Sequence, residues 1–358
     1  MLNLFRKIVL NYMSKVIIGI HGLGNKPPKE VLEDWWKKSM IEGLRRIGKG
    51  TALPKFEMVY WADVIYKKPL NEMLTDKNHP LYLDEKYAAI SREFQNEDHG
   101  IRKKIISFLG RQLNKLFLNE DYTLNFSVIS DAIIHLYFND LEIYYNKNCE
   151  NPANLNCRAK TIIRERVAEV IEKYRRHKIF LIAHSMGSIV AYDTITFLKP
   201  KIKIHTFATI GSPLGLPAVI GKIAAEMKDF MGRDGFIGTP PGVVKNWYNF
   251  SDILDKIALN YKLSDIYSEN AMGIKPVDFL VTNDYMMQGC RNPHKSFGYL
   301  RAPEFSEILY GFIKTEKRKV GRRVARSINS LLSRIQVASK YLGRKRIIQT
   351  FNNYYFKK

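Results

Sequence analysis

Residues 179–191 read Ile-Phe-Leu-Ile-Ala-His-Ser-Met-Gly-Ser-Ile-Val-Ala, which is an apolar run, a short polar turn and a second apolar run. The first run has the length and composition of a buried strand, and the second run continues as a helical pattern. Ser185 lies in the turn between them. Ala183 and Gly187, two positions before and after it, are small enough to allow a sharp bend. This stretch therefore predicts a strand that leads directly into a covering helix.

Further apolar runs on both sides of this unit alternate with helical patterns. Strands are predicted at residues 16–20, 57–60, 179–183, 202–210, 243–250 and 277–282. Helices are predicted at residues 30–47, 159–174, 188–198 and 304–313. Such alternation is typical of an α/β fold with a mainly parallel central sheet and helices on both faces. An apolar fraction of 46% with 12% aromatic residues supports a folded core and excludes a chain that is disordered throughout.

The strand pattern lapses at about residues 66–156, where helical patterns at residues 84–94 and 101–117 replace it. We interpret this stretch as a helical insertion. It is either a lid over a site or an ordinary helical connection without a gating role. The predicted organisation is thus a leader at residues 1–14, the main domain at residues 15–314 including the insertion, and a basic C-terminal tail at residues 315–358.

The tail is the most basic part of a basic chain. The sequence has 57 Lys and Arg against 35 Asp and Glu, a formal net charge of +22, and residues 314–358 hold 14 of these bases with a single acid, Glu316. A helix in the tail would have one cationic and one apolar face. The apolar residues at three- or four-residue spacings are Val320, Val324, Ile328, Leu331, Ile335 and Leu342. This pattern is typical of a helix that binds an anionic membrane surface.

Two other interpretations of the tail stay open. The helix could pack on the domain with a solvated basic face, or it could bind nucleic acid. Nucleic acid is the weaker expectation, because no recognition motif accompanies the basic residues.

The cellular location is predicted from the cysteines and the apolar runs. Cys149, Cys157 and Cys290 form neither a CxxC pair nor an even set, which favours a reducing compartment. No apolar run reaches the roughly 18 residues that a spanning helix needs, and the N-terminal residues do not form a signal peptide. We expect a cytoplasmic protein that is peripheral at the inner membrane face.

Ser185 has the setting of a catalytic nucleophile. The tight turn would project its hydroxyl above the edge of the sheet and would aim the Met186 N–H, at the start of the helix, at a developing oxyanion. The residues His-Gly-Leu-Gly-Asn at 21–25 follow the first predicted strand, and their small side chains allow a second N–H, that of Leu23, to approach Ser185. The alternative interpretation of residues 21–25 is an ordinary glycine-rich turn.

Five stretches together resemble the lipase and esterase branch of the α/β-hydrolase superfamily. They are HGLGNKP, AHSMG, TIGSPLG at residues 209–215, WYNFSDILDKIA and NPHKSFGYL. The resemblance covers about residues 15–310 without the insertion. It implies an α/β-hydrolase fold, a Ser-His-Asp triad, no cofactor and hydrolysis of a carboxylic ester through an acyl-enzyme. Ala183 departs from the GxSxG form, in which a Gly stands there.

The resemblance also implies the base and the acid, since these enzymes carry Ser, acid and His in that order along the chain. His294 is the histidine in a late loop after Ser185, whereas His205 lies inside a predicted strand. Asp255 and Asp252 are both candidates for the acid. Asp255 is favoured because the residues that follow it resemble the family pattern. The other carboxylate is expected to cap the following turn.

The expected function is hydrolysis of a small-molecule or lipid ester with Ser185, His294 and Asp255, without a metal. The histidines His79, His99, His135 and His177 show no metal-ligand spacing. The superfamily is broad, so hydrolysis of an amide or a thioester stays open. A non-catalytic protein that keeps the fold for interactions is the alternative from a different class.

Overall fold

The computed structural model describes residues 14–50, 52–90, 144–145, 159–198, 202–231, 237–258 and 262–314. The predicted leader apart from Ser14, most of the predicted insertion and the whole of the tail at residues 315–358 lie outside the described residues. The chain divides into two compact units after Leu309. The site described below lies in the first unit.

The described chain forms a sheet of six strands in which every neighbouring pair is parallel. The strands are β1 (Lys15–Ile20), β2 (Lys55–Val59), β3 (Lys178–His184), β4 (Ile204–Ile210), β5 (Val243–Ser251) and β6 (Pro276–Leu280). Their order across the sheet is β2-β1-β3-β4-β5-β6. Each strand overlaps one that the apolar runs predicted. The α/β class and the mainly parallel sheet are therefore confirmed.

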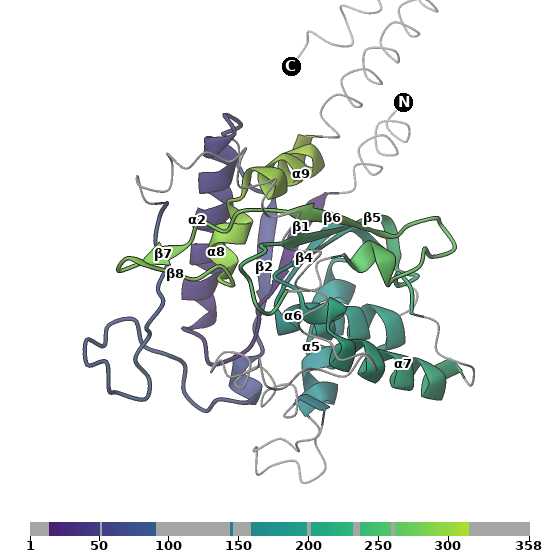
Figure 1. Cartoon of the computed structure of the whole chain (residues 1–358), viewed down its shortest axis with the longest axis horizontal. Helices are drawn as coiled ribbons and strands as arrows, with labels where there is room; N and C mark the ends of the chain where they lie inside the picture. Colours follow the sequence, from purple (N-terminus) through teal and green to yellow (C-terminus); the bar gives the residue numbers. More distant parts are fainter. Residues whose placement is uncertain are drawn as a thin grey trace, which may run out of the picture. The chain divides into compact units, whose positions relative to one another are not determined.

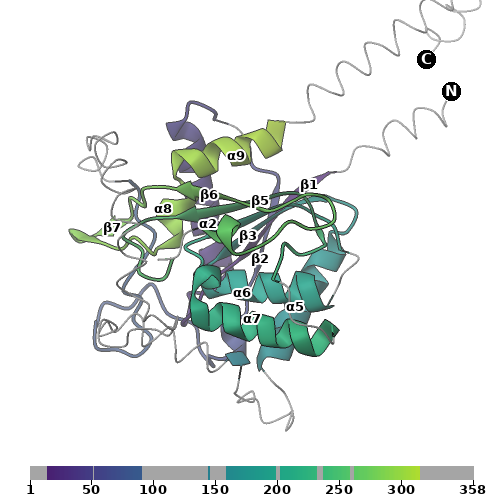
Figure 2. The same cartoon turned by 45° about the vertical axis from the view of Figure 1, so that its right-hand side comes forward.

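Both faces of the sheet are covered by helices, because the strands are apolar on both sides. Three helices lie together on one face (Figure 2): α5 (Ala159–Lys173), α6 (Met186–Asp193) and α7 (Pro217–Met231). On this face Val16 of β1, Ile163 of α5 and Ile189 of α6 belong to one buried apolar cluster.

The other face is covered by α2 (Lys29–Arg46), with α8 (Ser296–Leu300) packed beside it (Figure 1), and by the first residues of α9 (Pro303–Lys314). The ring of Phe305 packs against those of Phe180 and Phe250, with centroids 6.1 and 5.4 Å apart. No helix in the described ranges is both long and apolar enough to cross a lipid bilayer.

The predicted helix at residues 84–94 is wrong over its described part, since residues 84–90 form irregular chain. Tertiary partners bond the backbone there: the Tyr285 hydroxyl donates to the Lys86 carbonyl at 2.7 Å, and the Arg301 guanidinium donates to the Ala88 carbonyl at 2.6 Å. These bonds satisfy polar groups that a helix would otherwise satisfy. The helix predicted at residues 101–117 lies outside the described residues.

The connections reverse direction between β1 and β3, which are neighbours in the sheet. β1 leads into α2 on one face, whereas β3 leads into α6 on the other. In open α/β sheets, the carboxyl ends of two such strands border the crevice in which ligands bind. Ser185 follows β3 and residues 21–25 follow β1, so both predicted parts of the site lie at this reversal.

Candidate active site

Ser185 occupies the turn between β3 and α6 with a φ of 54° and a ψ of −131°, a conformation that residues other than Gly rarely adopt. Its backbone N–H donates to the Ile210 carbonyl at the end of β4, at 3.1 Å. Gly187 lets α6 begin close to the loop after β1, because a Cβ at this position would lie 2.5 Å from the His21 carbonyl oxygen. The turn thus has the strained geometry that places a nucleophile at the top of a sheet.

Hydrogen bonds through Ser188 and Ser212 stabilise this turn. The Ser188 hydroxyl donates to the Ser185 carbonyl at 2.6 Å and lies 2.7 Å from the Ser212 hydroxyl. Because the Ser188 hydroxyl donates its one proton to the Ser185 carbonyl, the Ser212 hydroxyl donates to Ser188 Oγ. The Ser212 oxygen also accepts the Leu214 N–H at 3.2 Å. The TIGSPLG stretch therefore ties the end of β4 to the Ser185 turn.

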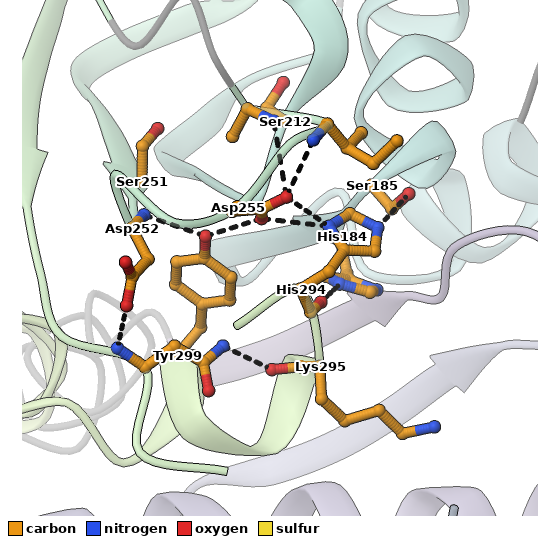
Figure 3. Close-up of polar contacts among 12 residues, drawn as sticks. His184, Ser185, Ser212, Ser251, Asp252, Asp255, His294, Lys295 and Tyr299 are labelled. Carbon is orange, nitrogen blue, oxygen red and sulfur yellow. Dashed lines mark hydrogen bonds and ion pairs between the residues drawn. The ribbon is translucent and has the colours of Figure 1, made fainter. Parts of the chain in front are cut away.

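His294 connects Ser185 to Asp255. Its Nε2 lies 2.9 Å from Ser185 Oγ, and its Nδ1 lies 2.9 Å from Asp255 Oδ2 and 3.0 Å from Oδ1 (Figure 3). Since a carboxylate only accepts, Nδ1 carries the imidazole proton and Nε2 accepts the Ser185 hydroxyl. An imidazole held in this way can take the Ser185 proton while the carboxylate fixes its orientation.

Asp255 is fully buried, and other donors hold its oxygens as well. Oδ1 accepts the Ile257 N–H at 2.9 Å, and Oδ2 accepts the Tyr299 hydroxyl at 2.7 Å. Burial, together with the Asp255 charge, raises the pKa of Tyr299 well above its ordinary value, so the phenol remains a donor. These bonds compensate the loss of water around the Asp255 carboxylate.

Asp252, the alternative acid, bonds to other partners. Its Oδ1 accepts the Leu254 N–H at 2.8 Å, and its Oδ2 accepts the Asn283 N–H at 2.6 Å and the Arg291 guanidinium at 2.9 Å. Burial raises the pKa of Asp252 despite these partners. In the part of the chain that the structure describes, Asp255 bonds to His294 and Asp252 does not. Asp252 instead caps the turn through the N–H of Leu254, two residues further on.

The loop after β1 passes directly beside Ser185. A Cβ at Gly22 would lie 2.7 Å from the Ser185 Cβ, so only glycine permits this approach. Within the described ranges, the backbone N–H groups of Leu23 and Met186 donate no hydrogen bond. Both donors that the sequence predicted for an oxyanion are thus available for a ligand.

His21 fixes the peptide that carries the Leu23 N–H. Its Nδ1 lies 2.7 Å from the Gly22 carbonyl oxygen, and its Nε2 accepts the Trp61 N–H at 3.0 Å. Burial, and then the charge of Lys26, lower the pKa of His21 to about 3, so the ring is neutral and Nδ1–H donates. Since the N–H and C=O of a trans peptide point in opposite directions, this bond directs the Leu23 N–H away from His21.

His184 is the last residue of β3, and His205 lies near the start of β4. His184 Nε2 donates to the His294 carbonyl at 2.7 Å, and burial, with the His294 charge, lowers the pKa of His184 well below its ordinary value. A neutral His184 thus holds the backbone of His294. His205 lies within β4, where its Nδ1 is 2.9 Å from the Thr206 hydroxyl.

Tyr299, Arg291 and the Ser188–Ser212 pair were not predicted as parts of the site. Tyr299 lies five residues after His294 in the NPHKSFGYL stretch, but no spacing rule relates it to Asp255. The same holds for Arg291 and Asp252, which come from different loops. In the described part of the chain, no group of three or more His, Cys, Asp and Glu side chains is arranged to hold a metal ion.

Comparison with known proteins assigns no family: no protein-family model matches the sequence, and no curated protein is significantly similar to it. The fold and the site therefore define an α/β protein in which a serine, a histidine and a buried aspartate are joined by hydrogen bonds at the carboxyl ends of parallel strands.

Proposed function

We propose that this protein is a serine hydrolase of the α/β-hydrolase fold that cleaves a carboxylic ester through an acyl-enzyme. The observation that carries the proposal is the hydrogen-bond chain from Ser185 through His294 to the buried Asp255. The positions of these residues support the fold assignment, because Ser follows β3, the acid follows β5 and His follows β6. This is the chain order of α/β-hydrolases.

In the first half of the reaction, Ser185 Oγ attacks the ester carbonyl carbon while its proton passes to His294 Nε2. The tetrahedral oxyanion accepts hydrogen bonds from the N–H groups of Leu23 and Met186. Asp255 stabilises the imidazolium. His294 then gives the proton to the leaving alcohol oxygen as the C–O bond breaks, and the acyl group stays on Ser185.

In the second half, His294 Nε2 takes a proton from a water molecule whose oxygen attacks the acyl carbon. The bond to Ser185 Oγ breaks, the proton returns to this oxygen, and the carboxylic acid leaves. The cycle needs no further co-reactant.

The test is the substitution Ser185→Ala. We expect wild-type protein to hydrolyse a p-nitrophenyl ester and to be labelled by a fluorophosphonate probe, and the variant to lose both activities by several orders of magnitude. Ser39→Ala is the matched control, because Ser39 is also buried and its hydroxyl donates to a backbone carbonyl, that of Trp35 at 2.9 Å, within α2. Labelling that persists in Ser185→Ala would show that another residue reacts.

A panel of esters, thioesters and amides with matched acyl groups then defines the substrate class. Preference for esters supports the proposal, whereas faster turnover of amides or thioesters assigns the same machinery to those bonds. A wild-type protein that neither turns over any of them nor reacts with the probe would favour the non-catalytic interaction protein.

A further inference from the structure

Residues 84–90, which precede the larger undescribed part of the chain, lie against the loop that carries His294. They are fixed there by bonds from elements distant in sequence. Besides the bonds from Tyr285 and Arg301 to this segment, the Ile90 N–H donates to Glu42 Oε1 of α2 at 2.8 Å. Residues 84–90 are thus held in a defined position next to the loop that carries His294.

Glu85 of this segment bonds to one residue before and one residue after His294 in the sequence. Its Oε1 accepts from the Asn292 side-chain amide at 2.5 Å, and its Oε2 accepts from the Lys295 ammonium at 2.8 Å. The oxygen of the same Asn292 amide, Oδ1, accepts the backbone N–H of His294 at 2.9 Å. Glu85 therefore determines which way the Asn292 amide points and holds residues 292–295 at two places.

The Glu85 carboxylate is also a charge near the imidazole. Burial acts to raise the pKa of Glu85, but the charge of Lys295, the hydrogen bonds from Asn292 and Lys295 and the charge of His294 outweigh burial, and the pKa is lowered. The group is therefore ionised at neutral pH. A negative charge at this place favours the imidazolium that forms when His294 takes a proton, and Lys295 opposes it.

We infer that Glu85 is a positioning residue for the catalytic base, which clamps the loop at residues 292–295 around His294 and supplies negative charge to the imidazolium. This inference rests on the proposed function. The competing explanation is an ordinary surface ion pair with Lys295, which contributes little to stability and nothing to catalysis.

The test uses two substitutions with opposite electrostatic effects. Glu85→Gln keeps an acceptor for Asn292 but removes the negative charge, and Lys295→Met removes the positive charge. The readout is the second-order rate of fluorophosphonate labelling of the full chain as a function of pH, which requires no knowledge of the substrate. We expect the acidic limb of this profile to move to lower pH by about 0.5 unit in Glu85→Gln and to higher pH in Lys295→Met. The plateau rate should fall about tenfold in Glu85→Gln.

Glu33→Gln is the matched control, because Glu33 likewise accepts a lysine ammonium, that of Lys37 at 2.9 Å, and an N–H, that of Met58 at 3.3 Å, away from the site. Its profile should equal that of wild type. Limbs that do not move, or that move in the same direction in both variants, would overturn the role of Glu85 while leaving the hydrolase intact. A wild-type protein that the probe does not label would reject the proposed function itself.

Discussion

Ser185 combines backbone strain with a complete set of hydrogen bonds. A residue other than glycine at a φ of 54° and a ψ of −131° costs on the order of 1–3 kcal/mol, which the surrounding structure must offset. Here the Ser185 N–H is held by Ile210, and its carbonyl accepts from both the N–H and the hydroxyl of Ser188. These backbone hydrogen bonds maintain the strained conformation, which places the hydroxyl 2.9 Å from His294 Nε2.

Substitution of the two carboxylates separates their roles. We expect Asp255→Asn to lower kcat for a p-nitrophenyl ester about 10⁴-fold, because the amide favours the wrong tautomer of His294. Asp252→Asn keeps an oxygen that can accept the Leu254 N–H, but it replaces the acceptor of Asn283 and Arg291 by an amide NH2 group and removes the negative charge. It should therefore lower the melting temperature but change kcat less than tenfold. Steady-state kinetics and thermal unfolding of both variants are the measurements. A larger loss of kcat in Asp252→Asn would reverse the assignment.

At the scale of elements, the face of the sheet under α5, α6 and α7 carries a polar cluster within its apolar packing. Asp193 at the end of α6 is fully buried, accepts the Tyr144 hydroxyl at 3.0 Å and lies 3.4 Å from the Lys160 ammonium. Arg164 and Lys160 of α5 also pair with Glu226 of α7. The cluster links three helices and the short described segment at residues 144–145.

Asp193 makes stability depend on pH in an unusual direction. Burial raises its pKa to about 6, against the lowering effect of Lys160, from 3.8 for an unperturbed group. The folded state therefore binds this proton more tightly than the unfolded state, so ionisation of Asp193 reduces stability as the pH rises from about 4 to about 6. The side chain in Asp193→Asn cannot ionise, so this variant does not lose stability in this way as the pH rises.

The prediction is a difference between variant and wild type that changes with pH. The free energy of unfolding of Asp193→Asn, relative to wild type, should rise by on the order of 3 kcal/mol between pH 4 and pH 7. Urea unfolding at several pH values measures this difference. Asp34→Asn is the control, because Asp34 is half exposed and pairs with Lys38 on the surface of α2. An equal difference at all pH values would contradict the role given to Asp193.

At the scale of the whole molecule, positive charge is concentrated in residues 314–358, nearly all of which lie outside the described part of the chain. The sequence predicts that this tail binds anionic lipid at about 1 kcal/mol per basic residue near the surface. For an enzyme that acts on lipid esters, such binding would hold the active site at its substrate.

Co-sedimentation with vesicles tests this prediction. The full chain should pellet with vesicles that contain phosphatidylserine and stay in solution with neutral vesicles, and added salt should weaken the binding. A chain that ends at Lys314 should lose most of the binding. Equal binding of both chains would count against a membrane role for the tail.

Local patterns in the sequence determined the strands, most of the helices and the Ser185 turn, because apolar periodicity and small residues act through near neighbours in the chain. Only the tertiary structure decided which of Asp252 and Asp255, three residues apart, bonds to His294, since this depends on where the loop with His294 packs. Tertiary contacts also decided the conformation of residues 84–90: their sequence pattern predicts a helix, but bonds from Tyr285 and Arg301 hold them as irregular chain. Contacts between distant segments leave no spacing rule in the sequence, and the support of the site by Tyr299 and Glu85 is of this kind.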